Sequence, residues 1–384
     1  MYVLCGGGRA ILFESNPFDE RQHPNIIATA PLGADNSYKF NLSDIAGAEH
    51  KALTAQEDKA MLGSAAPPMD LDLIHQRMGH RNKRDLAAAL GQGKMTGLPP
   101  MKNKKTGVCS DCAKAKSTRA SIGHAHEDSK SRKNIERLTL APRESIVQRI
   151  NTDLKGPMSV AGYHGELYMQ LFTASNTKWR TAFCFKSKDI AAANWETLVD
   201  VQLASEGQRV LEYHSDGAPE LISKRIVIFS AARKCKVSYS PAYTPELNGL
   251  AEISNKIIWE SAFSMLLACA LPYTFWPFAV SYATLISNFV CTTTAFGWMT
   301  PWEAKYGSAP DISAFRKFGC IVYAHIDKSL RDKTFTDKAY KGYFLGLQFP
   351  LMNRAIVYIP EQADIVESLH VIYDEVTVLK RTAF

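Results

Sequence analysis

The pattern of apolar and polar residues divides the first part of the chain into segments of different predicted structure. Short apolar runs separated by turn residues fill residues 1–45 and predict a β-rich unit. Within 70–120, the apolar spacing predicts two short helices, at 71–80 and 83–90, before a Cys-x-x-Cys turn. The charged stretch 124–137 that follows is typical of a linker.

The next part of the chain predicts a sheet with helices. Alternating runs at 145–152, 165–175 and 181–187, separated by turn residues, predict a three-stranded meander. An amphipathic helix is then expected to open at Asp189. A strand, a helix and a short strand follow at 209–216, 220–234 and 237–240. Because strands and helices alternate here, the segment predicts an α/β fold.

The last part of the chain predicts two long helices and a second group of strands. One helix is expected at 250–271 and another after Pro272, and short apolar runs between 315 and 375 predict a small β-barrel. The long apolar stretch is cut by Pro272 and Pro277, and the first residues lack a basic start and a long apolar core. We therefore expect no membrane span and no signal peptide.

Composition indicates the size of the chain and the charge of its partner. A chain of 384 residues with 46% hydrophobic content predicts a globular protein of two or three domains. The net charge is +7, but thirteen Lys or Arg against four Asp or Glu fall between Arg81 and Lys133. This stretch suits an anionic partner, although it also fits a solvated surface. The eight cysteines include one close pair, which excludes a disulfide scaffold and indicates a reducing compartment.

Two histidines and two cysteines form the first candidate site: His75, His80, Cys109 and Cys112. The histidines are separated by four residues, the cysteines by two, and the pairs by 28. Such a set supplies the four ligands of a closed, structural zinc site. The alternative is a pair of surface histidines and two buried thiols. His124 and His126 could compete as ligands, but no thiol pair lies near them in the sequence.

Three carboxylates form the second candidate site: Asp153, Asp216 and Glu252. Asp153 and Asp216 each end a predicted strand before a turn, and Glu252 lies near the start of the long helix, with 35 residues between it and Asp216. Such residues can converge at one edge of a mixed sheet, where their oxygens would bind a pair of Mg²⁺ or Mn²⁺ ions. The simpler alternatives are a turn or cap role for Asp153 and a helix-dipole role for Glu252.

Together the three carboxylates favour metal chemistry over these separate roles. Packed without cations they would repel one another. Two ions about 4 Å apart can activate an attacking oxygen and stabilise the leaving one in phosphoryl transfer. The predicted chemistry is therefore that of a nuclease or a strand-transfer enzyme.

At these residues the chain closely resembles the integrase region of copia-type (Ty1/copia) retrotransposon polyproteins, over residues 35–384. The segments "HQRMGH" and "CSDCAKAKSTRAS" resemble the zinc module that precedes the integrase core. The segments "NTDLKGP", "YHSDGAPE" and "SPAYTPELNGLAEISNKII" resemble the three catalytic blocks, and "FRKFGCIVYAH" resembles the start of an SH3-like barrel. In this order the motifs are highly specific, whereas each alone is weak.

The resemblance implies an α/β fold with an RNase H-like mixed five-stranded sheet, flanking helices, a helical zinc module before it and an SH3-like β-barrel after it. It implies that Asp153, Asp216 and Glu252 hold Mg²⁺ or Mn²⁺ and that the His/Cys set holds Zn²⁺. Residues expected to bind DNA are Lys114, Lys116, Arg119, Asn248 and Lys256.

The implied activity is 3′-end processing of element DNA followed by strand transfer into target DNA. The partners would be double-stranded DNA, as element ends and as target, and further copies of the chain, with no membrane. The location would be a cytoplasmic particle and the nucleus.

The same resemblance implies domain boundaries. The expected parts are a β-rich remnant of an upstream module at 1–45, a zinc-binding module at 46–125, a linker at 126–143, a catalytic core at 144–305 and an SH3-like domain at 306–384. We expect the chain to be a piece of a polyprotein or a decayed copy.

The chain departs from the usual family pattern at two places. Ala174 and Ser175 stand where an acidic pair is usual, and Ile253 and Ser254 stand where basic residues usually follow the catalytic Glu. The second departure is expected to remove two phosphate contacts. Three readings therefore compete: an active integrase, a nucleic-acid-binding remnant that no longer joins strands, and a plain RNase H-type nuclease, which the zinc module disfavours.

Overall fold

The chain forms two compact units, Met1–Ala66 and Pro67–Phe384. The computed structural model describes residues 2–6, 9–13, 26–31, 69–101, 107–117, 146–240, 249–269, 271–326, 337–350 and 352–377. In the first unit, strands β1 (Tyr2–Gly6), β2 (Arg9–Phe13) and β3 (Ile26–Pro31) form an antiparallel sheet, as the apolar runs predicted. The linker predicted at 124–137 lies outside the described residues, and the domain boundaries stay predictions.

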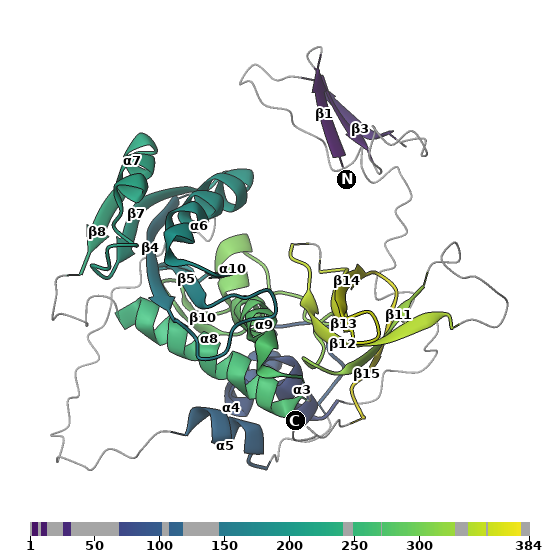
Figure 1. Ribbon diagram of the computed structural model, residues 1–384. Helices are drawn as coiled ribbons and strands as arrows, with labels where there is room; N and C mark the ends of the chain where they lie inside the picture. Colours follow the sequence, from purple (N-terminus) through teal and green to yellow (C-terminus); the bar gives the residue numbers. More distant parts are fainter. Residues whose placement is uncertain are drawn as a thin grey trace, which may run out of the picture. The chain divides into compact units, whose positions relative to one another are not determined.

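The second unit is built around a mixed five-stranded sheet (Figure 1). Its strands, in the order β6-β5-β4-β7-β8, are β6 (Arg180–Phe185), β5 (Tyr168–Ala174), β4 (Ile146–Lys155), β7 (Arg209–Ser215) and β8 (Lys236–Tyr239). The strands β4, β5 and β6 pair antiparallel as the predicted meander, whereas β7 and β8 pair parallel to β4. This is the predicted RNase H-like arrangement.

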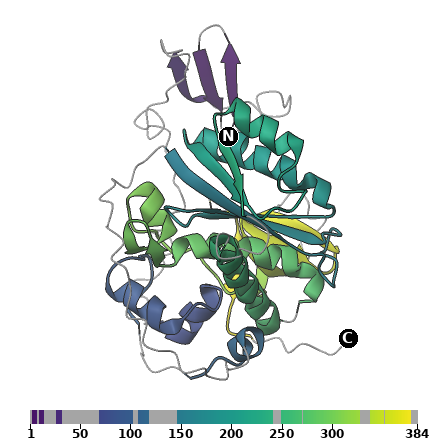
Figure 2. The same ribbon diagram turned by 90° about the vertical axis from the view of Figure 1, so that its left-hand side faces the viewer.

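Helices cover both faces of this sheet (Figure 2). One face carries α6 (Ala191–Thr197), its continuation η2 (Leu198–Leu203) and α7 (Lys224–Ala232). The other carries α8 (Gly249–Ala268) and α9 (Trp276–Phe289), which follows the turn η4 (Tyr273–Phe275). The helix predicted to open at Asp189 begins instead at Ala191, because Lys188–Ile190 forms a 3₁₀ turn, η1.

Short elements follow α9 in the second unit. The hairpin β9 (Thr292–Thr294) and β10 (Gly297–Met299) precedes α10 (Pro301–Tyr306). The hydroxyl of Thr300 accepts a hydrogen bond from the Glu303 N–H and so caps α10. None of the helices in the described residues is long and apolar enough to cross a membrane.

The segment that carries the His/Cys set contains α3 (Leu71–Arg77), α4 (Lys83–Gly91) and α5 (Ser110–Lys116). The side chains of Asp70 and Asn82 accept hydrogen bonds at the starts of α3 and α4. The buried side chains of these helices belong to the same apolar core as α8 and α9. Packing against α8 and α9 therefore helps to hold this segment, in addition to any metal.

The C-terminal strands form a second antiparallel five-stranded sheet that fits the predicted SH3-like fold. Its strands, in the order β14-β13-β12-β11-β15, are β14 (Asp364–Ser368), β13 (Ala355–Ile359), β12 (Ala339–Leu347), β11 (Ile321–His325) and β15 (Val371–Asp374). Tyr282 of α9 packs edge-on against Phe344 of β12, with ring centroids 5.4 Å apart. The sheet thus shares a core with α8 and α9.

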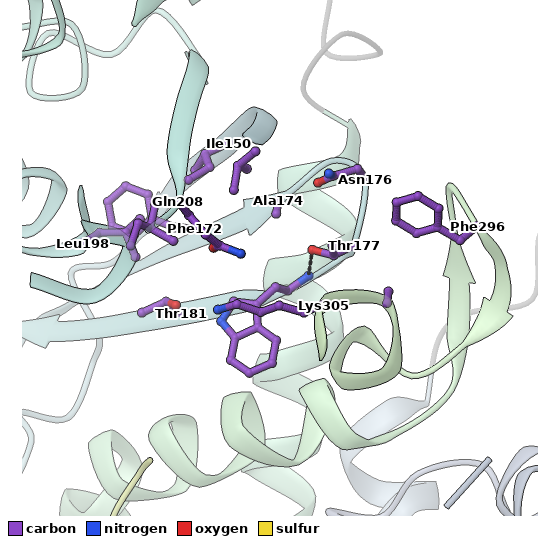
Figure 3. Close-up of a pocket in the computed structure, with 14 residues that line it drawn as sticks. Ile150, Phe172, Ala174, Asn176, Thr177, Thr181, Leu198, Gln208, Phe296 and Lys305 are labelled. Atoms are coloured by element: carbon purple, nitrogen blue, oxygen red, sulfur yellow. Dashed lines mark hydrogen bonds between the residues drawn. The ribbon is translucent and has the colours of Figure 1, made fainter. Parts of the chain in front are cut away.

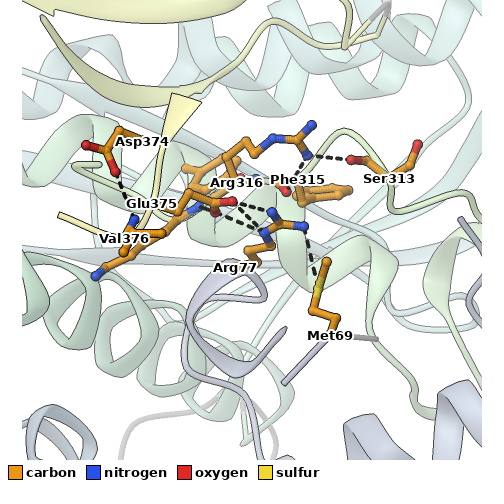
Figure 4. A network of polar contacts seen from close by, with 10 residues as sticks. Met69, Arg77, Ser313, Phe315, Arg316, Asp374, Glu375 and Val376 are labelled. Atoms are coloured by element: carbon orange, nitrogen blue, oxygen red, sulfur yellow. Dashed lines mark hydrogen bonds and ion pairs between the residues drawn. The ribbon is translucent and has the colours of Figure 1, made fainter. Parts of the chain in front are cut away.

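A buried ion pair joins α3 to the end of this sheet (Figure 4). The Arg77 guanidinium donates from Nε to both carboxylate oxygens of Glu375, at 2.9 and 3.0 Å, and a further bond runs from its Nη2. The Glu375 carboxylate also accepts the backbone N–H of Lys317 at 2.7 Å. Both side chains of the pair are at most 14% exposed, so the pair is shielded from solvent.

Candidate active site and zinc centre

The sheet register brings Asp153 and Asp216 to the same edge. The strands β4 and β7 are parallel neighbours, and their last paired residues are Asn151 and His214. Asp153 lies two residues beyond Asn151, and Asp216 lies two residues beyond His214. The two aspartates therefore continue the same register. The sequence prediction that they come together is supported by this register.

The position of Asp153 within its strand differs from the prediction. The strand β4 does not end there but runs to Lys155. The reason is the other neighbour, β5, which pairs with β4 as far as Lys155 and Met169, whereas pairing with β7 stops earlier. Asp153 is therefore held by backbone hydrogen bonds on one side and open on the other.

The helix α8 places Glu252 beside this edge. Glu252 lies in the first turn of α8 and is exposed. One turn later, the buried Asn255 donates a hydrogen bond from Nδ2 to Asp153 Oδ2 at 2.7 Å. Because residues three apart share one side of a helix, this bond brings the first turn of α8 to Asp153.

The electrostatics of Asp153 reflect all three carboxylates. Burial raises the pKa of Asp153, while hydrogen bonds from the Leu154 N–H and from Asn255 lower it. The negative charges of Asp216 and Glu252 add to the rise in this pKa. The three carboxylates therefore repel one another across this edge, and cations would relieve the repulsion.

The donor atoms at this edge suit hard divalent cations. Two carboxylates from adjacent strands and one from a helix offer oxygen ligands, which Mg²⁺ and Mn²⁺ prefer. Asp216 is half-buried, and its Oδ1 accepts a long hydrogen bond of 3.4 Å from the Ala218 N–H. Its carboxylate thus keeps lone pairs for a cation.

The four predicted zinc ligands converge. The ligand atoms of His75, His80, Cys109 and Cys112 all lie within 4.8 Å of one another. The Cys112 sulfur lies 3.3 Å from His75 Nε2 and 3.6 Å from His80 Nδ1, and the Cys109 sulfur lies 3.5 Å from His80 Nδ1. A tetrahedral zinc with ordinary Zn–N and Zn–S bonds has S···N edges of about 3.6 Å. The cluster therefore fits zinc.

The surroundings orient this cluster. His75 Nδ1 lies 2.5 Å from the Arg81 carbonyl oxygen, so it carries the proton and leaves Nε2 for a metal. Burial lowers the pKa of His80 to about 3, with a smaller effect from His75, and burial raises the pKa of Cys112 to about 11. Without metal these shifts favour the neutral forms of His80 and Cys112, and zinc binding would release the Cys112 thiol proton.

The turn between the two histidines is anchored to α8. Gly79 and His80 both have left-handed backbones, with φ of 59° and 57°. The Ser261 hydroxyl of α8 donates to the Gly79 carbonyl at 2.5 Å, and a Cβ on Gly79 would lie 2.6 Å from that hydroxyl oxygen. Glycine is therefore required where this turn meets the helix that carries Glu252.

The predicted DNA-binding residues have different surroundings. Lys114 and Lys256 are exposed, and Lys256 lies 3.9 Å from Glu260. Lys116 is half-buried and donates to the His80 carbonyl at 2.6 Å, so its ammonium supports the His/Cys cluster. Arg119 and Asn248 lie outside the described residues.

The two departures on α8 also differ from each other. Ile253 is 59% exposed, whereas Ser254 is fully buried. A basic residue at 254 would therefore point inward and could not reach a phosphate. Of the two phosphate contacts expected to be lost, only the one at Ile253 remains. With this exposure, the Ile253 side chain does not face the core.

No protein-family model matches the chain. Over 285 residues the chain is 24% identical to the retrovirus-related Pol polyprotein from transposon TNT 1-94 of Nicotiana tabacum, covering 74% of this chain and 20% of that protein. It is also 24% identical, over 304 residues, to the Pol polyprotein from transposon RE1 of Arabidopsis thaliana, covering 78% and 19%.

Two solved structures show more distant likeness. The BIV integrase catalytic core is 15% identical with a TM-score of 0.32, covering 42% of this chain and 95% of that one. The HTLV-2 integrase catalytic core in complex with magnesium is 18% identical with a TM-score of 0.32, covering 42% and 97%. The curated relatives confirm the resemblance to copia-type Pol polyproteins, of which this chain spans about a fifth of the length.

Proposed function

We propose that this chain, a relative of transposon Pol polyproteins, is the integrase region of such a polyprotein and processes and joins DNA 3′ ends. The observation that carries the proposal is that the β4–β7 register places Asp153 and Asp216 at one edge of the sheet, while the Asn255 bond brings the first turn of α8, which carries Glu252, to Asp153. Phosphoryl transfer needs such a set of oxygen ligands at one accessible edge.

Each residue of the edge has a separate task in this proposal. Asp153 and Asp216 supply carboxylates from the sheet, and Glu252 supplies one from the helix. Asn255 holds Asp153 in place through its 2.7 Å bond. When bound, a pair of divalent metal ions would activate the attacking oxygen and stabilise the leaving oxygen at phosphorus.

The partner we propose is double-stranded DNA, both as element end and as target. The exposed Lys114 and Lys256, together with the basic composition of residues 81–133, would neutralise backbone phosphates. Assembly of several copies, and work in a cytoplasmic particle and the nucleus, belong to the same proposal. The His/Cys cluster would hold one structural zinc, because all four of its positions are filled by protein ligands.

A strand-joining assay tests the function. The purified chain is incubated with a short labelled duplex and Mn²⁺, and products longer than the substrate strand are measured. Wild type should give joined products and Asp216→Asn none. The matched control is Asp200→Asn, which neutralises a surface carboxylate paired with Arg233 and should join like wild type.

The other outcomes identify the rival functions. Duplex binding without joined or shortened products would favour a nucleic-acid-binding remnant. Shortened products without joining would favour a plain nuclease. Equal joining by wild type and Asp216→Asn would reject the carboxylate site.

A further inference from the structure

A cavity in the second unit lies away from the three carboxylates. It has a volume of about 630 Å³ and is lined by residues of β6, η2, α9 and α10, with Trp179, Tyr306 and Phe349 as aromatic walls. Thr181 and Lys305, which line the adjoining pocket in Figure 3, also line this cavity. A volume of this size, with mainly apolar walls, is ordinary for a site that binds a small organic molecule.

The lining also includes a buried guanidinium that lacks a partner. Arg180 is 4% exposed, and its Nε has no hydrogen-bond partner. No ion pair of Arg180 occurs among the described residues. Its backbone is fixed, because Asn288 accepts from the Arg180 N–H at 2.8 Å and donates to the Arg180 carbonyl at 2.9 Å. A buried guanidinium without an acceptor is costly, so its place here calls for an anion.

The charges around Arg180 are mostly positive. Burial lowers the pKa of Arg180 to about 9, and the nearby charge of Arg81 contributes in the same direction. Arg180 in turn lowers the pKa of Lys178, after the larger effect of burial. The one acidic side chain of the lining, Glu206, is already paired with Lys305 at 2.6 Å. The described surroundings therefore leave the positive charge of Arg180 uncompensated.

We propose that this cavity binds a small organic anion, whose apolar body lies against Trp179, Tyr306 and Phe349 and whose carboxylate, sulfonate or phosphate pairs with Arg180. The planar guanidinium offers two parallel N–H donors that match such oxyanions. None of Asp153, Asp216 and Glu252 lines the cavity, so the site is separate from the proposed catalytic edge.

The first test is stability without ligand. Arg180→Met keeps an unbranched apolar side chain and removes the charge, so it should leave the melting temperature unchanged or raise it. The matched control is Arg77→Met, which breaks a buried and fully paired guanidinium and should lower the melting temperature clearly. A similar loss for Arg180→Met would mean that a protein carboxylate already pairs with Arg180, and would overturn the proposal.

The second test is binding, with two probes of similar body and different charge. 1-Anilinonaphthalene-8-sulfonate carries a sulfonate, and N-phenyl-1-naphthylamine is its neutral analogue. Fluorescence titration of the folded chain should show one saturable sulfonate site whose affinity falls at least tenfold in Arg180→Met and partly in Arg180→Lys. The neutral probe should bind the variants as it binds wild type. Equal sulfonate binding by wild type and Arg180→Met, or no saturable site in wild type, would contradict the proposal.

Discussion

Ile253→Arg should restore a phosphate contact on the helix that carries Glu252. The two residues are adjacent in the first turn of α8, and both are exposed, whereas Ser254 and Asn255 after them are buried. An arginine at 253 would therefore extend from the surface that surrounds the carboxylate edge. Duplex DNA bound at that edge would present its backbone to this side chain.

The size of the effect follows from counterion release. Each neutralised phosphate of duplex DNA adds about 0.9 to the slope of log affinity against log salt. One new contact should therefore steepen the slope by about 0.9, which makes a fourfold rise in salt cost about 3.5-fold more affinity than in wild type. Since Ile253 is 59% exposed, the change in stability should stay within about 0.5 kcal/mol.

The assay is a titration of one duplex at several salt concentrations, with a thermal melt of each protein. Ile228→Arg is the matched control, because Ile228 is 70% exposed on α7, a helix that carries none of the three carboxylates. It adds the same charge elsewhere and should leave the slope near that of wild type. An unchanged slope in Ile253→Arg, or the same steepening in both variants, would refute the placement of DNA over the start of α8.

Four further substitutions test other parts of the structure. Cys109→Ser should lower the zinc content, which metal analysis should find near one per wild-type chain, and should lower the melting temperature without complete unfolding, because the helices also pack on the shared core. Asp216→Asn should melt at the same or a higher temperature than wild type without metal, and should gain less stability from Mg²⁺ in a thermal melt. Asn255→Ala removes the 2.7 Å donor to the sheet carboxylate and should reduce strand joining in the duplex assay more than it lowers the melting temperature. Glu375→Gln breaks the buried ion pair with α3 and should cost about 3–5 kcal/mol in chemical denaturation.

The sequence predicted the main elements of the fold because their patterns are local. The apolar runs of β5 and β6 and the apolar length of α8 and α9 are read directly from neighbouring residues. The end of β4 was not predictable in this way, because its length depends on a partner strand. The start of α6 was displaced by a 3₁₀ turn, a shift of the kind that local patterns rarely resolve.

The candidate sites were predicted to different depths. The His/Cys set was found from residue type and spacing, which the chemistry of metal binding restricts. The three carboxylates were inferred in the same way, and their role as a metal set stays a prediction. Asn255 was missed, although its position three residues after Glu252 was a usable signal for a shared helix side. The burial of Ser254 and the lack of a partner for the Arg180 guanidinium depend on tertiary packing. Neither can be predicted from a local sequence pattern.

The most direct test of the central claim is a Mn²⁺ titration of the zinc-loaded chain, followed by the electron paramagnetic resonance signal of free Mn²⁺. If Asp153, Asp216 and Glu252 form one metal centre, wild type should bind Mn²⁺ at a saturable site. Asp153→Asn, Asp216→Asn and Glu252→Gln should each weaken that site, and Asp200→Asn should bind as wild type does. Mn²⁺ binding that survives unchanged in any of the three carboxylate variants would contradict the account.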